Sequence, residues 1–171
     1  MKYKINLDLT SKYTLTLKLF ENVKNMKEIK EKITGGNFQC GLIKPSRILD
    51  PFQVAVAANK AVTSDIITRT LYTEILFNLS LSSNISSSLK TFGASEEDTD
   101  LLVAILAKED EENDVLFDDI DGEEVDVFKL SQICDIKLIK KEYKITEAEL
   151  LNNSLLDVIV SKIAVKDVVQ Q

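Results

Sequence analysis

Histidine and tryptophan are both absent from this chain of 171 residues. Without histidine, the chain cannot assemble a Ser-His-Asp triad, a histidine general base or an imidazole metal ligand. Glycine is scarce, with five residues, and neither a GxxxxGK[ST] nor a GxGxxG sequence occurs. The adjacent Gly35 and Gly36 follow an expected helix and are interpreted as its end. We therefore expect a chain without cofactor or metal that is not an enzyme.

Cysteine and long apolar runs are also scarce. Cys40 and Cys134 stand alone, without the CxxC spacing of a metal or redox site, so two reduced thiols are expected. No run of eighteen apolar residues occurs, so no membrane span is expected. The first residues, MKYKINLDLT, lack the apolar region of a secretion signal. These absences favour an intracellular protein.

Charge is divided unevenly along the sequence. Residues 1–90 hold 13 Lys and Arg against 7 Asp and Glu, a net charge of +6, whereas residues 96–126 have a net charge of −14. The overall charge of −7 therefore hides a basic N-terminal half. Because charges act on phosphates over about 8 Å at physiological salt, this local balance decides whether nucleic acid can bind.

The hydrophobic pattern predicts one α/β (α+β) domain over residues 1–171, with a central mixed or antiparallel sheet flanked by helices. Strands are predicted at residues 4–9, 14–20, 38–43, 71–79 and 101–106. Helices are predicted over residues 26–33, from 50, from 84, over 128–134 and 136–143, and from about 153. Residues that favour helix ends support these boundaries: Asn25, Asp50-Pro51, Asn84 and the capping-box pair Thr146 and Glu149 at helix starts, and Gly93 in the left-handed conformation after a helix.

Acidic residues dominate the segment from about 108 to 126, which is interpreted as a loop. A calcium loop needs oxygen ligands at alternating positions around a glycine, and Asp119, Asp121 and Gly122 do not fit that pattern. A solvated run of charge is the better interpretation. Further along, Leu155 and Ile159 belong to a wide apolar stripe that fits either ordinary core or a partner-binding surface.

Residues 50–93 are the most distinctive part of the sequence. They contain the motifs DPFQ from Asp50, AANKAV from Ala57, TRTL from Thr68, TEI from Thr73, FNLS from Phe77, NIS from Asn84, and Lys90 with Phe92-Gly93. In these motifs the chain resembles the PRPK-binding (TPRKB) subunit family of the KEOPS (EKC) complex. Weaker similarity extends through Leu19-Phe20 and Val23-Lys24-Asn25 on one side and through 155–157 and 166–168 on the other.

The resemblance implies a non-catalytic subunit of a complex that places threonylcarbamoyl on the adenosine beside the tRNA anticodon. Its direct partner would be the PRPK-type atypical kinase, with the transferase and the other KEOPS subunits as indirect partners. It would help recruit tRNA through the 3′ CCA end, and it would be found in the nucleus and the cytoplasm. A generic protein-interaction module without RNA binding and a small carboxylate-dependent enzyme are the alternatives.

The candidate RNA-binding residues are Asn59, Lys60, Arg69 and Thr70. Arg and Lys would hold phosphates, and Asn and Thr would reach the sugar or base edges of an unstacked tail. In relatives the intervening link is longer and rich in lysine, whereas this chain has only the five residues 63–67 there. The resemblance therefore implies a tRNA contact that is weaker here than in those relatives.

Overall fold

The computed structural model describes residues 1–108, 111 and 114–169, and it is built around a five-stranded antiparallel sheet. Strand order is β1-β2-β4-β3, and β5 pairs with the end of β2 beyond β1. The strands are β1 (Tyr3–Asn6), β2 (Tyr13–Glu21), β3 (Gly41–Ile43), β4 (Leu101–Lys108) and β5 (Glu123–Val125). The predicted α/β class with an antiparallel sheet is confirmed.

Helices make up most of the remaining chain. Three 3-10 helical turns lie in the connections between elements: η1 (Pro45–Arg47) precedes α2, η2 (Asp114–Asp119) precedes β5, and η3 (Val127–Lys129) precedes α5. The α-helices are α1 (Met26–Thr34), α2 (Pro51–Thr63), α3 (Leu71–Leu79), α4 (Ile85–Phe92), α5 (Leu130–Ile133), α6 (Ile136–Glu142), α7 (Glu147–Leu150) and α8 (Leu155–Val169).

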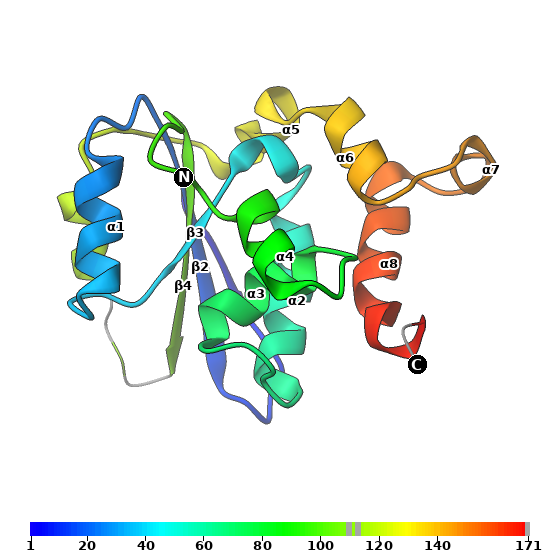
Figure 1. Cartoon of the computed structure of the whole chain (residues 1–171), viewed down its shortest axis with the longest axis horizontal. Helices are drawn as coiled ribbons and strands as arrows, with labels where there is room; N and C mark the ends of the chain where they lie inside the picture. Colours follow the sequence, from blue (N-terminus) through cyan, green and yellow to red (C-terminus); the bar gives the residue numbers. More distant parts are fainter. Residues whose placement is uncertain (109–110, 112–113, 170–171) are drawn as a thin grey trace.

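Both faces of the sheet are covered: alternate residues of β2 from Leu15 to Leu19 are buried, and every residue of β4 from Leu101 to Leu106 is buried. Leu15, Leu17 and Leu19 of β2 and alternate residues of β4 share one core cluster with residues of α2 and α3, and α8 joins this cluster by packing on α2. Phe20 and the intervening residues of β4 face α1 and the acidic segment. Figure 1 shows the result, with α1 on one side of the sheet and α2, α3, α4 and α8 on the other. The uninterrupted apolar run of residues 101–106 predicts a central strand that is buried on both faces, and β4 confirms this prediction.

The prediction of a strand at residues 71–79 is wrong, because this segment forms α3. Thr70 accepts a hydrogen bond from the N–H of Thr73, and the Thr73 hydroxyl accepts one from the N–H of Thr70, which makes a capping box. All residues from Glu74 to Leu79 are buried, since α3 packs against α2, α4 and β3. Tertiary packing has overridden the local β propensity here.

Two of the predicted helix-end roles are also wrong. Asn25 makes no capping bond to α1; its side chain donates to the carbonyl of Asp119 and accepts from the N–H of Asp121. Gly93 ends α4 with φ −75°, which is not left-handed. It is needed for space, because a Cβ there would lie 2.5 Å from the carbonyl oxygen of Leu89. The caps at Asp50, Asn84 and Thr146 form as predicted.

The acidic segment is only partly an open loop in the part that the structure describes. It contains η2 and β5, and Phe117 and Ile120 are buried against the α1 face of the sheet. The amide of Asn25 joins it to the start of α1. Residues 109–110 and 112–113 of the predicted acidic loop lie outside the described residues.

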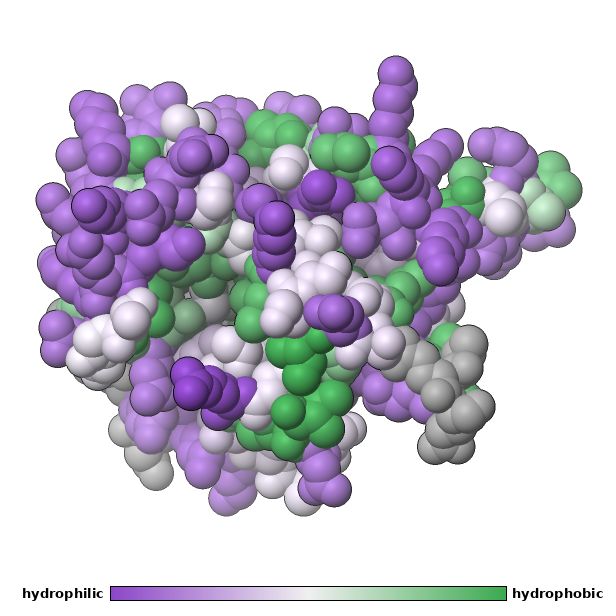
Figure 2. Space-filling model, in the orientation of Figure 1, coloured by the Kyte–Doolittle hydropathy of each residue, from purple (hydrophilic) through white to green (hydrophobic). Residues whose placement is uncertain are grey.

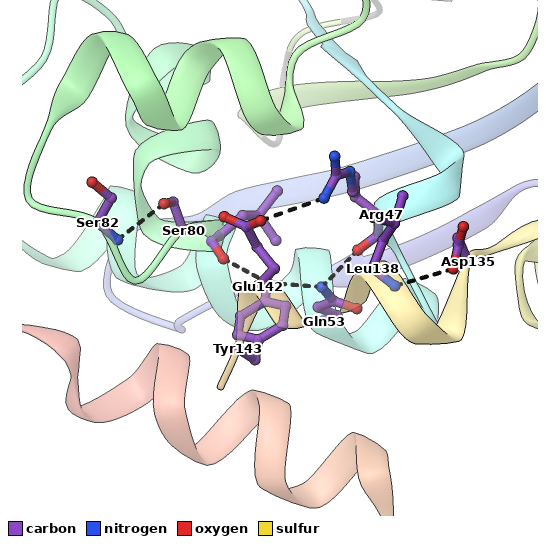
Figure 3. A network of polar contacts seen from close by, with 9 residues as sticks. Arg47, Gln53, Ser80, Ser82, Asp135, Leu138, Glu142 and Tyr143 are labelled. Carbon is purple, nitrogen blue, oxygen red and sulfur yellow. Dashed lines mark hydrogen bonds and ion pairs between the residues drawn. The ribbon is translucent and has the colours of Figure 1, made fainter. Parts of the chain in front are cut away.

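A buried polar network fastens the C-terminal helices to the core (Figure 3). The hydroxyl of Tyr143, directly after α6, donates to the carbonyl of Leu79 and accepts from the Gln53 amide at 2.9 Å. Burial raises the pKa of Tyr143, so the hydroxyl keeps its proton at neutral pH. Nearby, Arg47 pairs with Glu142 at 3.4 Å. These contacts join α6 to α2 and α3, and they set the position of the segment leading to α8.

Candidate functional site

Asn59 and Lys60, near the C-terminal end of α2, are engaged in contacts within the protein. The Asn59 side-chain oxygen accepts a hydrogen bond of 2.9 Å from the N–H of Asp8, in the turn between β1 and β2. The Lys60 ammonium donates to the carbonyl of Ile163 at 2.8 Å and pairs with Asp167 at 3.0 Å. Only 14% of the Lys60 side chain is exposed. Both residues therefore hold neighbouring elements to α2.

Lys166 makes the reciprocal contact from α8. Its ammonium donates to the carbonyl of Phe77 on α3 and lies 3.3 Å from the centroid of the Phe77 ring. Burial, with a smaller contribution from the charge of Lys60, lowers the pKa of Lys166 to about 8. A cavity of about 200 Å³ beside these lysines is lined by Glu74, Phe77, Asp167 and other residues of the three helices. This lysine pair anchors α8 to the core.

Arg69 differs from Lys60 in that it is exposed and has no acidic partner among the residues that the structure describes. Glu74, an acid close to Arg69 in sequence, does not pair with it. The Glu74 carboxylate instead accepts hydrogen bonds from the N–H and hydroxyl of Thr68 at 2.9 and 2.6 Å. Thr70 caps α3. Arg69 is therefore the predicted site residue whose charge is free to meet an anion.

A larger cavity of about 400 Å³, here called the β3 cavity, opens beside Thr70. It lies between α1, β3, α3 and α4, and Figure 2 shows the surface hollowed between α1 and α4 with hydrophobic atoms in its depth. Its lining combines apolar residues with polar groups at the rim: Ile33, Phe38, Tyr72, Leu76 and Leu89, with Lys30, Gln39, Thr70 and Thr73. The structure thus brings Thr70 to this cavity, while Lys60 lines the smaller one.

The outer face of α8 is a feature that the sequence analysis missed. The apolar stripe predicted there is only partly turned inward: Val158, Ile159 and Ile163 are buried, Leu155 and Leu156 are half-buried, and Val165 is exposed. A second apolar series at four-residue spacing, which we call the outer α8 face, becomes exposed toward the C-terminal end of the helix: Leu156 and Val160 are half-buried, and Ala164 and Val168 are exposed. Val168 is 73% exposed and the neighbouring Val165 is 45% exposed. The four-residue spacing of the outer series could have indicated this face in the sequence. One helix cannot turn both this series and the inner stripe toward the same core.

Catalytic features are not prominent in the described part of the chain. No group of three or more His, Cys, Asp or Glu that could hold a metal ion occurs among those residues. Glu74 is the buried carboxylate of the described residues, and it accepts a hydrogen bond from the hydroxyl of Thr68. Within the same residues, none of the helices combines the length and apolar character needed to traverse a bilayer. The arrangement offers surfaces for binding.

Comparison with known proteins identifies relatives along nearly the whole chain. The model of a family described as kinase binding protein CGI-121 matches residues 20–167. The EKC/KEOPS complex subunit TPRKB of Danio rerio is 40% identical over 169 residues, which cover 95% of this chain and 97% of the relative. The EKC/KEOPS complex subunit CGI121 of Yarrowia lipolytica is 30% identical over 140 residues, covering 77% and 79% of the two chains. That of Debaryomyces hansenii is 27% identical over 158 residues, covering 80% of each.

Proposed function

Because this chain belongs to the CGI-121 family of kinase binding proteins, we propose that it is a non-catalytic subunit of a KEOPS complex that binds the kinase of that complex. In this role it supports the transfer of threonylcarbamoyl to the adenosine beside the tRNA anticodon by another subunit. The same proposal includes a location in the nucleus and the cytoplasm. The lack of histidine and of phosphate-binding loops agrees with a subunit that binds without reacting.

The outer α8 face is the observation that carries the proposed kinase contact. Its four residues are apolar, Ala164 and Val168 in its C-terminal half are exposed, and the two anchoring lysines hold the helix against α2 and α3. A preformed apolar helix face suits a partner groove, because little ordering is needed before the surfaces meet. Such interfaces gain most of their affinity from a central apolar cluster.

A charge in the middle of this face tests the kinase contact. Ala164→Asp introduces a carboxylate on the exposed side of α8, and we expect it to weaken kinase binding at least tenfold, since the charge would have to lose its water. Ala148→Asp, on exposed α7, makes the same chemical change elsewhere and should leave the affinity unchanged. Calorimetric titration of the kinase with each variant measures both effects. Equal affinities for Ala164→Asp and the unmodified chain would reject α8 as the docking face.

The proposal for tRNA centres on Arg69 and the β3 cavity. Arg69, just before α3, supplies a cation without an acidic partner among the described residues, and the next residue, Thr70, lines a cavity that also has the aromatic residues Phe38 and Tyr72 and several polar groups. These are the groups that hold the phosphate and the base of an unstacked nucleotide. Lys60 contributes less in this arrangement, because Asp167 already neutralises it.

Binding of a short single strand ending in CCA tests this site. Arg69→Ala should weaken binding about threefold to tenfold and lower the log–log salt slope by about 0.7. Trimming CCA from the strand should reproduce the loss for the unmodified chain, with no further loss for the variant. Lys24→Ala, which removes an exposed cation near α1, is the matched control and should bind normally. If Arg69→Ala and Lys24→Ala behave alike, the tail contacts another surface.

A further inference from the structure

Lysines gather along the exposed side of α6 and its C-terminal cap. Lys137, Lys141 and Lys144 are exposed and Lys140 is half-buried. At 3.6 residues per turn, the three helical positions 137, 140 and 141 lie within about 100° around the helix axis and span roughly 6 Å along it, and Lys144 follows in the cap. The buried Ile139 and Tyr143 occupy the side that faces the core. We call this row the lysine ridge, and Figure 2 shows hydrophilic side chains standing out from the surface over α6.

The nearby acids do not neutralise the ridge. The Asp135 carboxylate caps α6 by accepting from the N–H of Leu138 at 3.0 Å, and Glu142 is turned to Arg47. Throughout the described part of the chain, no side chain forms an ion pair with any of the four lysines. The row therefore carries four positive charges that have no ion-pair partner among the described residues.

This arrangement costs the isolated chain stability. Lysines at four-residue spacing, such as Lys137 and Lys141, repel each other by about 0.2–0.5 kcal/mol per pair. The helix dipole favours a cation in the last turn, but that benefit falls off within one turn. Lys137, in the first turn, gains nothing from it. An anion laid along the ridge would relieve the repulsion.

Lys144 adds a second cost. It has φ 49°, in the left-handed region where glycine is the usual residue. The N–H of Lys144 donates to the carbonyl of Lys141 at 3.2 Å, and that of Ile145 donates to the carbonyl of Lys140 at 2.9 Å, which completes a Schellman cap. A lysine at this position adds charge to the ridge at the expense of backbone strain.

We propose that the lysine ridge binds the phosphate backbone of double-stranded RNA, as a contact separate from the one at Arg69. Neighbouring ridge positions are about 5–6 Å apart, and long lysine side chains can reach successive phosphates from them. A lysine ammonium acts as a point charge and does not distinguish between bases. The contact is therefore expected to involve the phosphates of the RNA and to be independent of the RNA sequence. This inference rests on the proposed role in tRNA recruitment, where a stem would follow the single-stranded tail.

A blunt RNA duplex without any single-stranded tail tests the ridge separately from the tail site. The full chain should bind this duplex with an affinity that falls as salt rises. Lys137→Ala combined with Lys141→Ala should weaken binding about tenfold and lower the log–log salt slope by about one to two units. The control, Lys24→Ala combined with Lys27→Ala, removes two exposed lysines of the α1 region and should leave both quantities unchanged. Thermal unfolding of each variant confirms that the fold is retained.

The outcomes separate the two RNA contacts. If the ridge variant binds the duplex as the unmodified chain does, or if the control loses as much affinity, the ridge is not an RNA surface. If the ridge variant instead loses affinity for the kinase and keeps it for the duplex, the ridge serves a protein partner and the inference is overturned. Loss of duplex binding in the ridge variant, with unaltered tail binding in Arg69→Ala, would keep the ridge and reject the tail site.

Discussion

At the scale of single residues, cations of this chain do different work according to their partners. Lys60 donates to the carbonyl of Ile163 and pairs with Asp167, and Lys166 donates to the carbonyl of Phe77. These contacts hold α8 in place. Arg69 and the lysine ridge have no acidic partner in the described part of the chain, so their charge faces outward. Sequence identifies the cations, but it does not say which of them are neutralised after folding, because Asp167 lies far along the chain from Lys60.

Lys166 makes the stability of the fold depend on pH. Its pKa is about 8 in the folded protein against 10.5 for the free side chain. The folded state releases the proton first, so the unfolded chain binds more protons between these values and stability rises with pH there. From about pH 8 to 10 the free energy of unfolding should rise by about 1–3 kcal/mol from this residue. From about pH 9 the raised pKa of Cys40 acts in the opposite direction, and from about pH 10 the raised pKa values of Tyr72 and Tyr143 do so as well.

Urea unfolding measures this dependence. In Lys166→Met the charge is gone and the apolar stem remains, so the rise between about pH 8 and 10 should disappear. Lys162→Met, on the same helix but with its ammonium paired to Glu149 near the surface, is the matched control and should keep the rise. An identical pH profile for Lys166→Met and the unmodified chain would show that Lys166 titrates normally.

At the scale of elements, the ends of helices were predicted better than the identity of α3. Asp50, Asn84 and Thr146 form their predicted caps, because capping depends on residues a few positions apart. Residues 71–79 are rich in β-prone side chains, yet Leu71, Ile75 and Leu79 also repeat every four residues. Since the segment from Glu74 to Leu79 is buried, no exposed polar face shows whether its sequence has a helical or a strand period. Its packing against neighbouring elements therefore determines that it is a helix.

Gly93 shows how close packing determines an element end. A methyl group at this position would lie 2.5 Å from the Leu89 carbonyl oxygen, which also accepts the hydrogen bond of the Gly93 N–H. Gly93→Ala should therefore lower the free energy of unfolding by about 1–3 kcal/mol. Gly35→Ala is the matched control at the end of α1, where the added carbon would lie 3.2 Å from the Glu31 carbonyl oxygen. Chemical denaturation compares the two; equal losses would mean that the contact at Gly93 relaxes freely.

At the scale of the whole molecule, family and fold class were predictable from the sequence and the binding surfaces were not. The family was predicted from short sequence motifs between residues 50 and 93, and the match of the family model over residues 20–167 confirms it. The outer α8 face depends on which side of α8 is turned inward, and that is decided by contacts with α2 and α3. The β3 cavity likewise combines residues from four separate elements. Surfaces assembled from distant segments leave no local pattern for sequence reasoning to find.

The proposed role as a kinase-docking, non-catalytic subunit is tested most directly by tRNA modification in a reconstituted complex. Threonylcarbamoyl transfer is measured with the kinase and transferase subunits together with the unmodified chain, Ala164→Asp or Ala148→Asp. We predict full stimulation by the unmodified chain and by Ala148→Asp, a loss of at least about tenfold at limiting concentration with Ala164→Asp, and no turnover by the chain alone. Modification of tRNA by the isolated chain, or equal stimulation by all three proteins, would contradict this role.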